Sequence, residues 1–232
     1  MFKKIILVLA ASLLLAVPAF ASEAAKTVVQ VSGASQQEVT PDTARISLVV
    51  NSIQDTIEKA KADNVRQVNK VLAALRDQGI GSEQIKTDTY QINPLYNYEK
   101  DKLPVLKGYQ VTQRLEVRTG IEQAGTIVNE VTRAGANEIA SIRFETADET
   151  SSKDKALQEA IQDALRKAEV IAGTLHKRVA NITLINESGV FYNPVMLETR
   201  MFKAVSADSG APNIPAGKVT VGANVQVTVE LE

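Results

Sequence analysis

The chain of 232 residues has no cysteine and only one histidine, His176. Without cysteine, the protein can form no disulfide bond, thiolate nucleophile, thiol redox sensor or cysteine-ligated metal site. A Ser-His-Asp arrangement would have to use His176, and no Gly-x-Ser-x-Gly motif accompanies it. Other metal ligands would have to be carboxylates, and their spacing matches no calcium loop. We therefore expect no metal, no cofactor and no enzymatic activity.

The chain also lacks any run of basic residues, and its 26 basic and 27 acidic side chains almost balance. This composition argues against nucleic acid as a partner. Hydrophobic residues make up 44% of the sequence, which is enough to form an ordinary core without disulfide bonds.

The first 21 residues have the pattern of a secretory signal peptide. Lysines at positions 3 and 4 form a basic head, an apolar run extends over residues 5–17, and alanines stand at positions 19 and 21. The run is shorter than the roughly 20 residues that span a bilayer, which favours a cleaved signal over a membrane anchor. We expect cleavage after Ala21, a mature chain of residues 22–232 without a transmembrane segment, and a periplasmic location.

Hydrophobic periodicity predicts the element order β-β-α-β-β-α-β-α-β-β. Residues 44–51 and 109–118 alternate as strands do, and the segments 85–99 and 108–119 should pair as a hairpin. Amphipathic helices are expected near residues 55–79, 119–135 and 153–176, the first closed by Gly79 in a left-handed conformation. Hairpins between helices favour a single α+β domain, with a mixed or largely antiparallel sheet packed against the helices. The β-α-β passages around the first and third helices hint at an internal duplication.

Alanine recurs at every fourth position of the third helix, at 156, 160, 164, 168 and 172. Residues four apart lie nearly above one another, so the methyl groups form a strip along which a partner can approach closely. We interpret the strip as the face of a helix laid closely on a sheet; a helix–helix seam between subunits is the alternative. His176 stands in the last turn beside Lys177 and Arg178, and we interpret it as a helix-terminal residue.

Short motifs follow one another in order along the chain. They are Val31-Ser32-Gly33, Pro41-Asp42-Thr43-Ala44, residues 75–80, Ile85-Lys86-Thr87, Gly108-Tyr109, Gly135-Ala136-Asn137, Asp163-Ala164, Lys167-Ala168-Glu169 and Pro215-Ala216-Gly217. In these motifs the chain resembles the SIMPL-domain family of exported bacterial proteins, which includes YggE-like and periplasmic immunogenic proteins. The resemblance implies an exported α+β protein, self-association, and a link to envelope or oxidative-stress tolerance. It implies no catalytic or ligand-binding residues.

An irregular loop is expected at about residues 188–217. Its apolar residues are Phe191, Tyr192, Met196, Met201 and Phe202. Long loops that carry apolar residues are usually functional or disordered. We predict that these residues contact a neighbouring subunit, or that the loop covers a groove. Four tyrosines on the expected hairpin, at 90, 96, 98 and 109, are interpreted as strand packing, with a contact surface as the alternative.

Three functional hypotheses follow. The leading one is a non-enzymatic periplasmic homo-oligomer that acts by self-association or by contact with other envelope proteins. The second is a module that binds a small apolar or peptide ligand between sheet and loop. The third is a carboxylate-based enzyme, since catalytic carboxylates distant in sequence leave no pattern.

Overall fold

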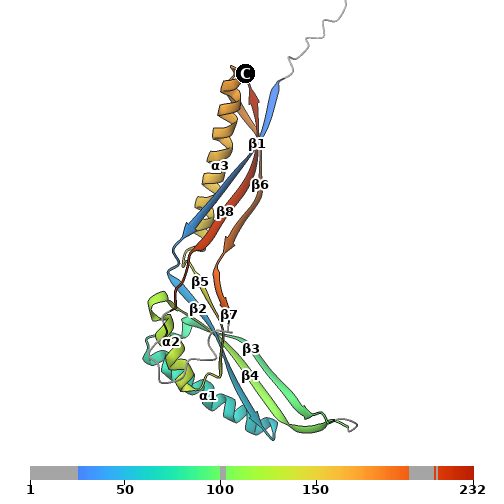
Figure 1. The fold of residues 1–232 in the computed structure, drawn as a ribbon, viewed down its shortest axis with the longest axis vertical. Helices are drawn as coiled ribbons and strands as arrows, with labels where there is room; N and C mark the ends of the chain where they lie inside the picture. The colour runs from blue at the N-terminus through green and yellow to red at the C-terminus, as the bar shows by residue number, and fades with distance from the viewer. Residues whose placement is uncertain (1–25, 100–102, 199–211, 213) are drawn as a thin grey trace, which may run out of the picture.

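The computed structural model describes residues 26–99, 103–198, 212 and 214–232. Figure 1 shows an elongated molecule with two lobes, one at each end. The fold is α+β, as predicted. The elements follow in the order β1 (Thr27–Val39), β2 (Thr43–Gln54), α1 (Ile57–Asp77), the 3-10 turn η1 (Ser82–Gln84), β3 (Ile85–Asn97), β4 (Val105–Gly120), α2 (Ile121–Ala134), β5 (Glu138–Glu145), α3 (Glu149–Thr174), β6 (Val179–Asn193), β7 (Val195–Glu198) and β8 (Val219–Leu231).

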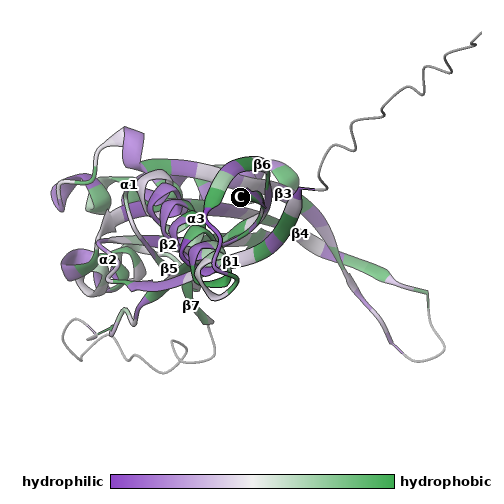
Figure 2. Cartoon of the chain, turned by 90° about the horizontal axis from the view of Figure 1, so that it is seen from above, coloured by the Kyte–Doolittle hydropathy of each residue, from purple (hydrophilic) through white to green (hydrophobic). Residues whose placement is uncertain are grey.

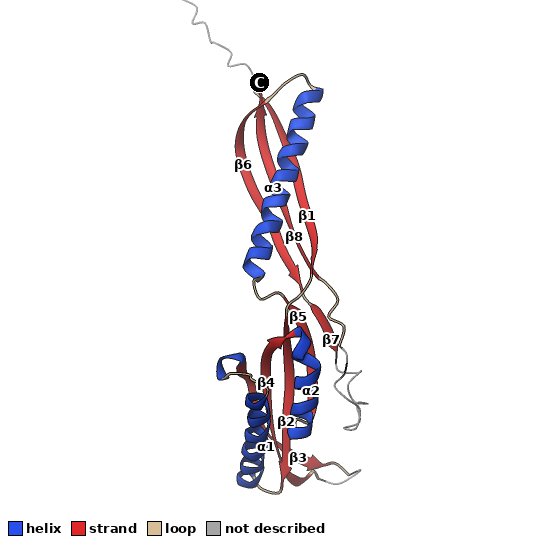
Figure 3. Cartoon of the chain, turned by 90° about the vertical axis from the view of Figure 1, so that its left-hand side faces the viewer, coloured by secondary structure: helices blue, strands red, loops and turns tan. Residues whose placement is uncertain are grey.

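Each lobe is built on its own antiparallel sheet. The three-stranded lobe has the strand order β1-β8-β6 and packs against α3, whereas the five-stranded lobe has the order β3-β4-β2-β5-β7 and packs against α1 and α2 (Figure 3). The antiparallel pairing was predicted, but the strands form two sheets instead of one. The reason is visible in Figure 1: after β1 the chain continues into β2 without turning back, so these consecutive strands enter different sheets.

Strands extend further into the stretch 188–217 than the sequence predicted. β6 continues through Gly189, and the short strand β7 pairs with β5. Gly189 has a φ angle of 137° and lies at a register shift between β6 and β8, so it forms a bulge within the strand where we expected the strand to end.

The expected internal duplication does not appear in the strand order. β2 and β3, which flank α1, lie in the same sheet, whereas β5 and β6, which flank α3, lie in different sheets. The two β-α-β passages therefore differ in topology.

The core of the five-stranded lobe lies between the sheet and its two helices. Alternate residues of β2 point into it, as a strand covered on one face requires. These residues, together with Val71 and Leu75 of α1, are completely buried: Ala44, Ile46, Leu48 and Val50. Gly79 follows α1 with a φ angle of 80°, and the N–H of Ile80 donates to the carbonyl of Leu75 at 3.0 Å, which confirms the predicted helix end.

The alanine strip of α3 forms the core of the three-stranded lobe. All five alanines are buried against β1 and β8, where valines alternate along β8. Gly33 of β1 permits the closest approach, because a Cβ atom there would overlap the carbonyl oxygen of Ala160 and lie 2.8 Å from the Cβ of Ala164. Leucines would hold the helix away from the sheet. The interpretation as a helix laid closely on a sheet is confirmed.

His176 follows the end of α3 in a left-handed conformation, with a φ angle of 54°. Its N–H donates to the carbonyl of Gly173 at 3.1 Å, and the N–H of Lys177 donates to that of Ala172 at 2.9 Å. This pair of bonds is the Schellman ending of a helix. The structure thus confirms His176 as a helix-terminal residue.

Candidate interaction surface

The motif Pro41-Asp42 lies at the junction between the lobes. The carboxylate of Asp42 accepts hydrogen bonds from the backbone N–H of Ala147 at 2.7 Å and from the hydroxyl of Thr43 at 2.8 Å. Its own N–H donates to the carbonyl of Glu145 at 3.2 Å. Asp42 therefore ties the β1–β2 connection to the β5–α3 connection, and its carboxylate has a structural role.

Asp163 and Lys167 of α3 lie against the free edge of β1. Asp163 accepts a hydrogen bond from the N–H of Ala34 at 3.1 Å, and the ammonium of Lys167 donates to the carbonyl of Ser32 at 2.9 Å. Lys167, the N–H of Ala34 and Arg166 together lower the pKa of Asp163 to about 2. These two side chains occupy backbone groups that an edge strand otherwise leaves open.

Acid should weaken the fold by protonating Asp163. The pKa of Asp163 is about 2 in the folded protein and ~3.9 in an unfolded chain. The ionised carboxylate therefore stabilises the fold fully above pH ~3.9, and this stabilisation is lost as the pH falls to about 2. We expect Asp163→Asn to lower the free energy of unfolding at pH 7 and to flatten its dependence on pH between about 4 and 2. Urea titration followed by circular dichroism measures both effects. Glu169→Gln, at an exposed site on α3, should change neither; an equally steep acid dependence in Asp163→Asn would contradict the prediction.

The motif Gly135-Ala136-Asn137 supports the centre of the five-stranded sheet. The side-chain oxygen of Asn137 accepts a hydrogen bond from the N–H of Asn51 at 2.6 Å. The backbone N–H of Asn137 donates to the carbonyl of Val49 at 2.9 Å. At Gly108, a Cβ atom would come within 2.5 Å of the carbonyl oxygen of Gln54. These motifs therefore hold the strands, the helix α3 and the lobe junction in place.

The outer strands of the two sheets differ in how their edges are protected. Asp163 and Lys167 occupy part of the edge of β1. β3 carries Pro94, which has no N–H to offer, and the charged residues Lys86 and Asp88. The 15 residues of β6 contain no proline and only one charge, Glu187, and its pairing with β8 is interrupted by three register shifts. Of the three long outer strands β1, β3 and β6, β6 has the fewest charges and prolines at its edge.

Three apolar residues in the middle of β6 are exposed, and we call them the β6 edge: Ile182, Leu184 and Ile185, at 41%, 59% and 48%. Ile182 and Ile185 pair with valines of β8 that face α3, and paired residues share a face. Leu184 pairs with Thr228 on the opposite face. Open backbone groups and exposed apolar side chains together are what strand addition requires.

The predicted contact residues lie in different surroundings. The ring of Phe191 lies over Gly222 of β8, where a side chain would otherwise stand. Tyr192 is half-buried; its hydroxyl accepts from the N–H of Thr146 at 2.7 Å, and the ammonium of Lys153 lies 5.9 Å from the centre of its ring. Met196, on the edge strand β7, is exposed. Met201 and Phe202 lie outside the described residues.

The exposure of the β6 edge was not predicted, because an apolar segment in a predicted strand is usually buried. The available signal was the run Ile182-Thr183-Leu184-Ile185, which does not alternate and so cannot bury all its apolar side chains on one face. Tyr90, Tyr96 and Tyr98 are also exposed, on the β3–β4 hairpin, whose pairing was predicted and is confirmed.

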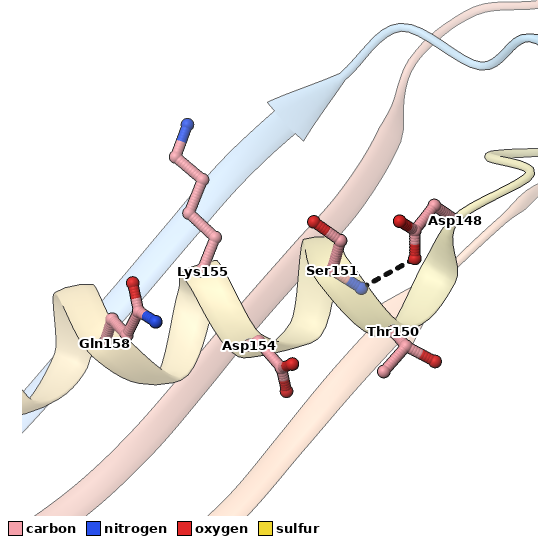
Figure 4. A pocket seen from close by; sticks show the side chains of 6 residues that line it. All are labelled: Asp148, Thr150, Ser151, Asp154, Lys155 and Gln158. Carbon is pink, nitrogen blue, oxygen red and sulfur yellow. Dashed lines mark hydrogen bonds between the residues drawn. The ribbon is translucent and has the colours of Figure 1, made fainter.

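The described residues also form two open hollows. One, of about 430 Å³, lies at the N-terminus of α3 and is lined by polar side chains (Figure 4): Asp148, Thr150, Ser151, Asp154, Lys155 and Gln158. Asp148 caps the helix by accepting from the N–H of Ser151 at 2.9 Å, and Figure 4 shows Lys155 and Asp154 pointing to opposite sides. The other, of about 550 Å³, lies at the lobe junction around Pro41 and Gly120. The side chains of the first hollow do not converge on a ligand.

The described residues contain neither a cluster of metal ligands nor a candidate membrane-spanning helix. No group of three or more histidine, aspartate or glutamate side chains among the described residues is arranged to hold a metal ion. No helix in the described ranges is both long enough and apolar enough to cross a bilayer.

The geometry defines a two-lobed α+β protein whose sequence motifs hold its strands and its lobe junction in place. The family model of SIMPL, described as a protein of unknown function (DUF541), matches residues 29–229, and the chain belongs to this family. The resemblance drawn from the sequence motifs is confirmed.

Curated relatives cover most or all of the chain. It is 28% identical over 243 residues to the 26 kDa periplasmic immunogenic protein of Brucella melitensis, covering 100% of this chain and 95% of the relative. It is 26% identical over 181 residues to the uncharacterized protein YggE of Escherichia coli K12, covering 78% and 73%. It is 27% identical over 174 residues to YggE of Edwardsiella ictaluri, covering 75% and 72%.

Proposed function

We propose that this is an exported periplasmic protein that acts without catalysis, by self-association along the β6 edge. Export is supported by the signal pattern of residues 1–21 and by the name of the Brucella relative, a periplasmic protein. Self-association is carried by one observation: a 15-residue edge strand that contains no proline and a single charge and that exposes apolar side chains.

Pairing with a second copy would provide partners for the backbone groups of the β6 edge and would bury its apolar side chains. An edge strand presents unpaired N–H and C=O groups, which a second strand occupies. Two β6 strands related by a two-fold axis run antiparallel, so two three-stranded sheets would join into one continuous sheet. Ile182 and Ile185 of both copies would then lie between the two α3 helices, where they would lose contact with water.

The same edge favours a second candidate function, the binding of an extended peptide. Strand addition uses backbone hydrogen bonds, which any extended chain offers. A peptide that binds there would raise the melting temperature of the protein with its concentration, as mass action requires. This candidate differs from the first in that the protein would remain a monomer without the peptide.

The proposal predicts a mature chain, residues 22–232, whose solution mass is a discrete multiple of the monomer mass. Leu184→Lys, which places a charge in the middle of the β6 edge, should shift the mass to that of the monomer. Light scattering on a sizing column measures both. Val170→Lys, at a 60% exposed site on α3, is the matched control and should leave the mass unchanged. A monomeric wild-type chain at every concentration would reject self-association and leave the peptide as the occupant of the edge.

Contact with other envelope proteins, and a role in envelope or oxidative-stress tolerance, would follow from such an assembly. Thiol chemistry cannot underlie that role, because the chain has no cysteine. The structural bonds of Asp42 and Asp163 support the proposal that these motif carboxylates are not catalytic.

A further inference from the structure

The three-stranded sheet is covered by a helix on one face only. α3 packs on the face that carries the buried valines of β8, and Figure 2, seen from above, shows this helix on one side of β1 and β6. The other face carries the alternate residues of the same strands, and on β1 all of them from Gln30 to Gln36 are exposed. We call it the open face. An antiparallel sheet can leave one face in water, so the side chains on that face show whether it suits a ligand.

The middle of the open face carries no charge. Four successive rows of three paired residues, one residue from each of β1, β8 and β6, make up this part. The rows are Gln30-Thr228-Leu184, Ser32-Gln226-Asn186, Ala34-Asn224-Gly189 and Gln36-Gly222-Phe191. Glu187, the single charge of β6, pairs with Val225 on the face that carries α3.

Charged side chains that border the open face are paired with opposite charges. At its two ends, Lys26 pairs with Glu230 and Lys218 pairs with Glu38, both at 3.1 Å. At the edge of β1, Asp163 pairs with Lys167 at 2.7 Å and with Arg166 at 2.5 Å. The open face therefore offers neither an acidic nor a basic ligand a cluster of opposite charge.

Amides are the main polar groups of the open face. Gln30 donates to Gln226 at 3.4 Å, whereas the side chains of Gln36, Asn186 and Asn224 have no hydrogen-bond partner among the described residues. An amide side chain offers two N–H donors and one acceptor oxygen without a charge. Sugar hydroxyl groups also donate and accept without a charge, so a neutral sugar matches this set of groups.

Phe191 adds a flat apolar surface to the open face. It pairs with Gly222, and a Cβ atom on Gly222 would overlap its ring, so one side of the ring lies on the backbone of β8. Phe191 is only partly buried, which leaves the other side of the ring accessible. The face of an aromatic ring is electron-rich, and it attracts the polarised C–H groups of a pyranose ring. Gln36 stands in the same row, and Asn224 stands in the next.

We propose that the open face binds an uncharged chain of pyranose sugars. One sugar ring stacks on Phe191 and exchanges hydrogen bonds with the amides of Gln36 and Asn224, and the next sugars lie along the rows toward Asn186. A flat face gives weak binding, and two open faces joined through paired β6 edges bind a long chain more tightly. The open face does not need the β6 edge to bind a sugar, so the two proposals can fail separately.

Saturation-transfer NMR on residues 22–232 tests the open face with three neutral tetramers: cellotetraose, maltotetraose and the tetramer of N-acetylglucosamine. At least one should bind. Phe191→Leu keeps an apolar side chain near Gly222 but removes the ring, and should raise the dissociation constant roughly tenfold. Asn224→Asp, at an exposed site, removes the amide donors and should also weaken binding. Tyr90→Leu removes a 46% exposed ring from β3 and is the control, with no change expected.

The outcomes separate a neutral sugar from other partners. Absence of a signal with all three tetramers overturns the proposal, as does unchanged binding in both Phe191→Leu and Asn224→Asp. Equal or tighter binding of tetragalacturonic acid, a chain of acidic sugars, overturns the neutral specificity. A change in the solution mass of Asn224→Asp shows that the open face packs on a second copy, and also overturns the proposal. Binding that persists in Leu184→Lys supports a sugar site independent of the β6 edge.

Discussion

Gly33→Val should destabilise the three-stranded lobe by about 3 kcal/mol. The added Cβ atom would overlap the carbonyl oxygen of Ala160 and lie 2.7 Å from the backbone nitrogen of Ala164. Backbone atoms in the middle of a long helix cannot move aside as the end of a flexible side chain can, so α3 would have to lift away from β1. The loss is measured as a lower midpoint in a urea titration followed by circular dichroism.

Gly173→Ala provides the control for this substitution on α3 itself. Gly173 is exposed, and no heavy atom lies within 4 Å of the position of its added Cβ atom. Alanine has the higher helix propensity, so this variant should be unchanged or up to ~1 kcal/mol more stable. A Gly33→Val protein that unfolds at the wild-type urea concentration would show that α3 does not lie as close to β1 as described.

Glu145→Gln should destabilise the five-stranded lobe by about 2 kcal/mol. Arg45 of β2 stands in register between Arg118 of β4 and Arg143 of β5, and like charges opposite one another repel. Arg45 donates to Glu145 at 2.6 Å and to Glu116 at 2.7 Å, bonds that hold the pKa of Arg45 above its ordinary value. The Glu145 side chain is only 13% exposed, so water replaces little of the lost charge.

Glu230 provides the control, because it forms an ion pair at the surface and is not surrounded by arginines. Glu230 pairs with Lys26 at 3.1 Å, and the lysine is 61% exposed. Glu230→Gln should therefore cost at most about 1 kcal/mol in urea unfolding. Added salt should recover part of the stability lost in Glu145→Gln, because it screens the repulsion among the arginines. Equal losses in the two variants would mean that the three arginines do not depend on Glu145.

The elements could be predicted where the signal is local. The alternation of β2 and β4, the hairpin between β3 and β4, and the left-handed Gly79 after α1 all follow from the preferences of neighbouring residues, and the structure agrees. Gly189 was misinterpreted because glycine ends a strand or forms a bulge with the same local signal. Only its pairing across from β8 decides between them.

The surroundings of the predicted contact residues could be predicted only in part. Phe191, Tyr192, Met196, Met201 and Phe202 were predicted to contact a partner, because these apolar residues stand in a stretch whose sequence looks irregular. Tyr192 proved to be bonded to Thr146, and Phe191 covers Gly222, so both have structural contacts that no local pattern reveals. Conversely, Ile182, Leu184 and Ile185 look like core residues, and their exposure depends on the position of β6 at the edge of its sheet.

The sequence by itself determined the absence of cysteine chemistry, the α+β composition, the family and the close approach of the alanine helix to a sheet. These follow from residue types and from their spacing within one element. Only the tertiary structure decided that there are two sheets, that Asp163 and Lys167 cover part of the edge of β1, and that β6 is an outer strand with exposed apolar side chains. Whether an apolar side chain is buried depends on which distant segment lies against it, and that choice is made by the packing of the whole chain.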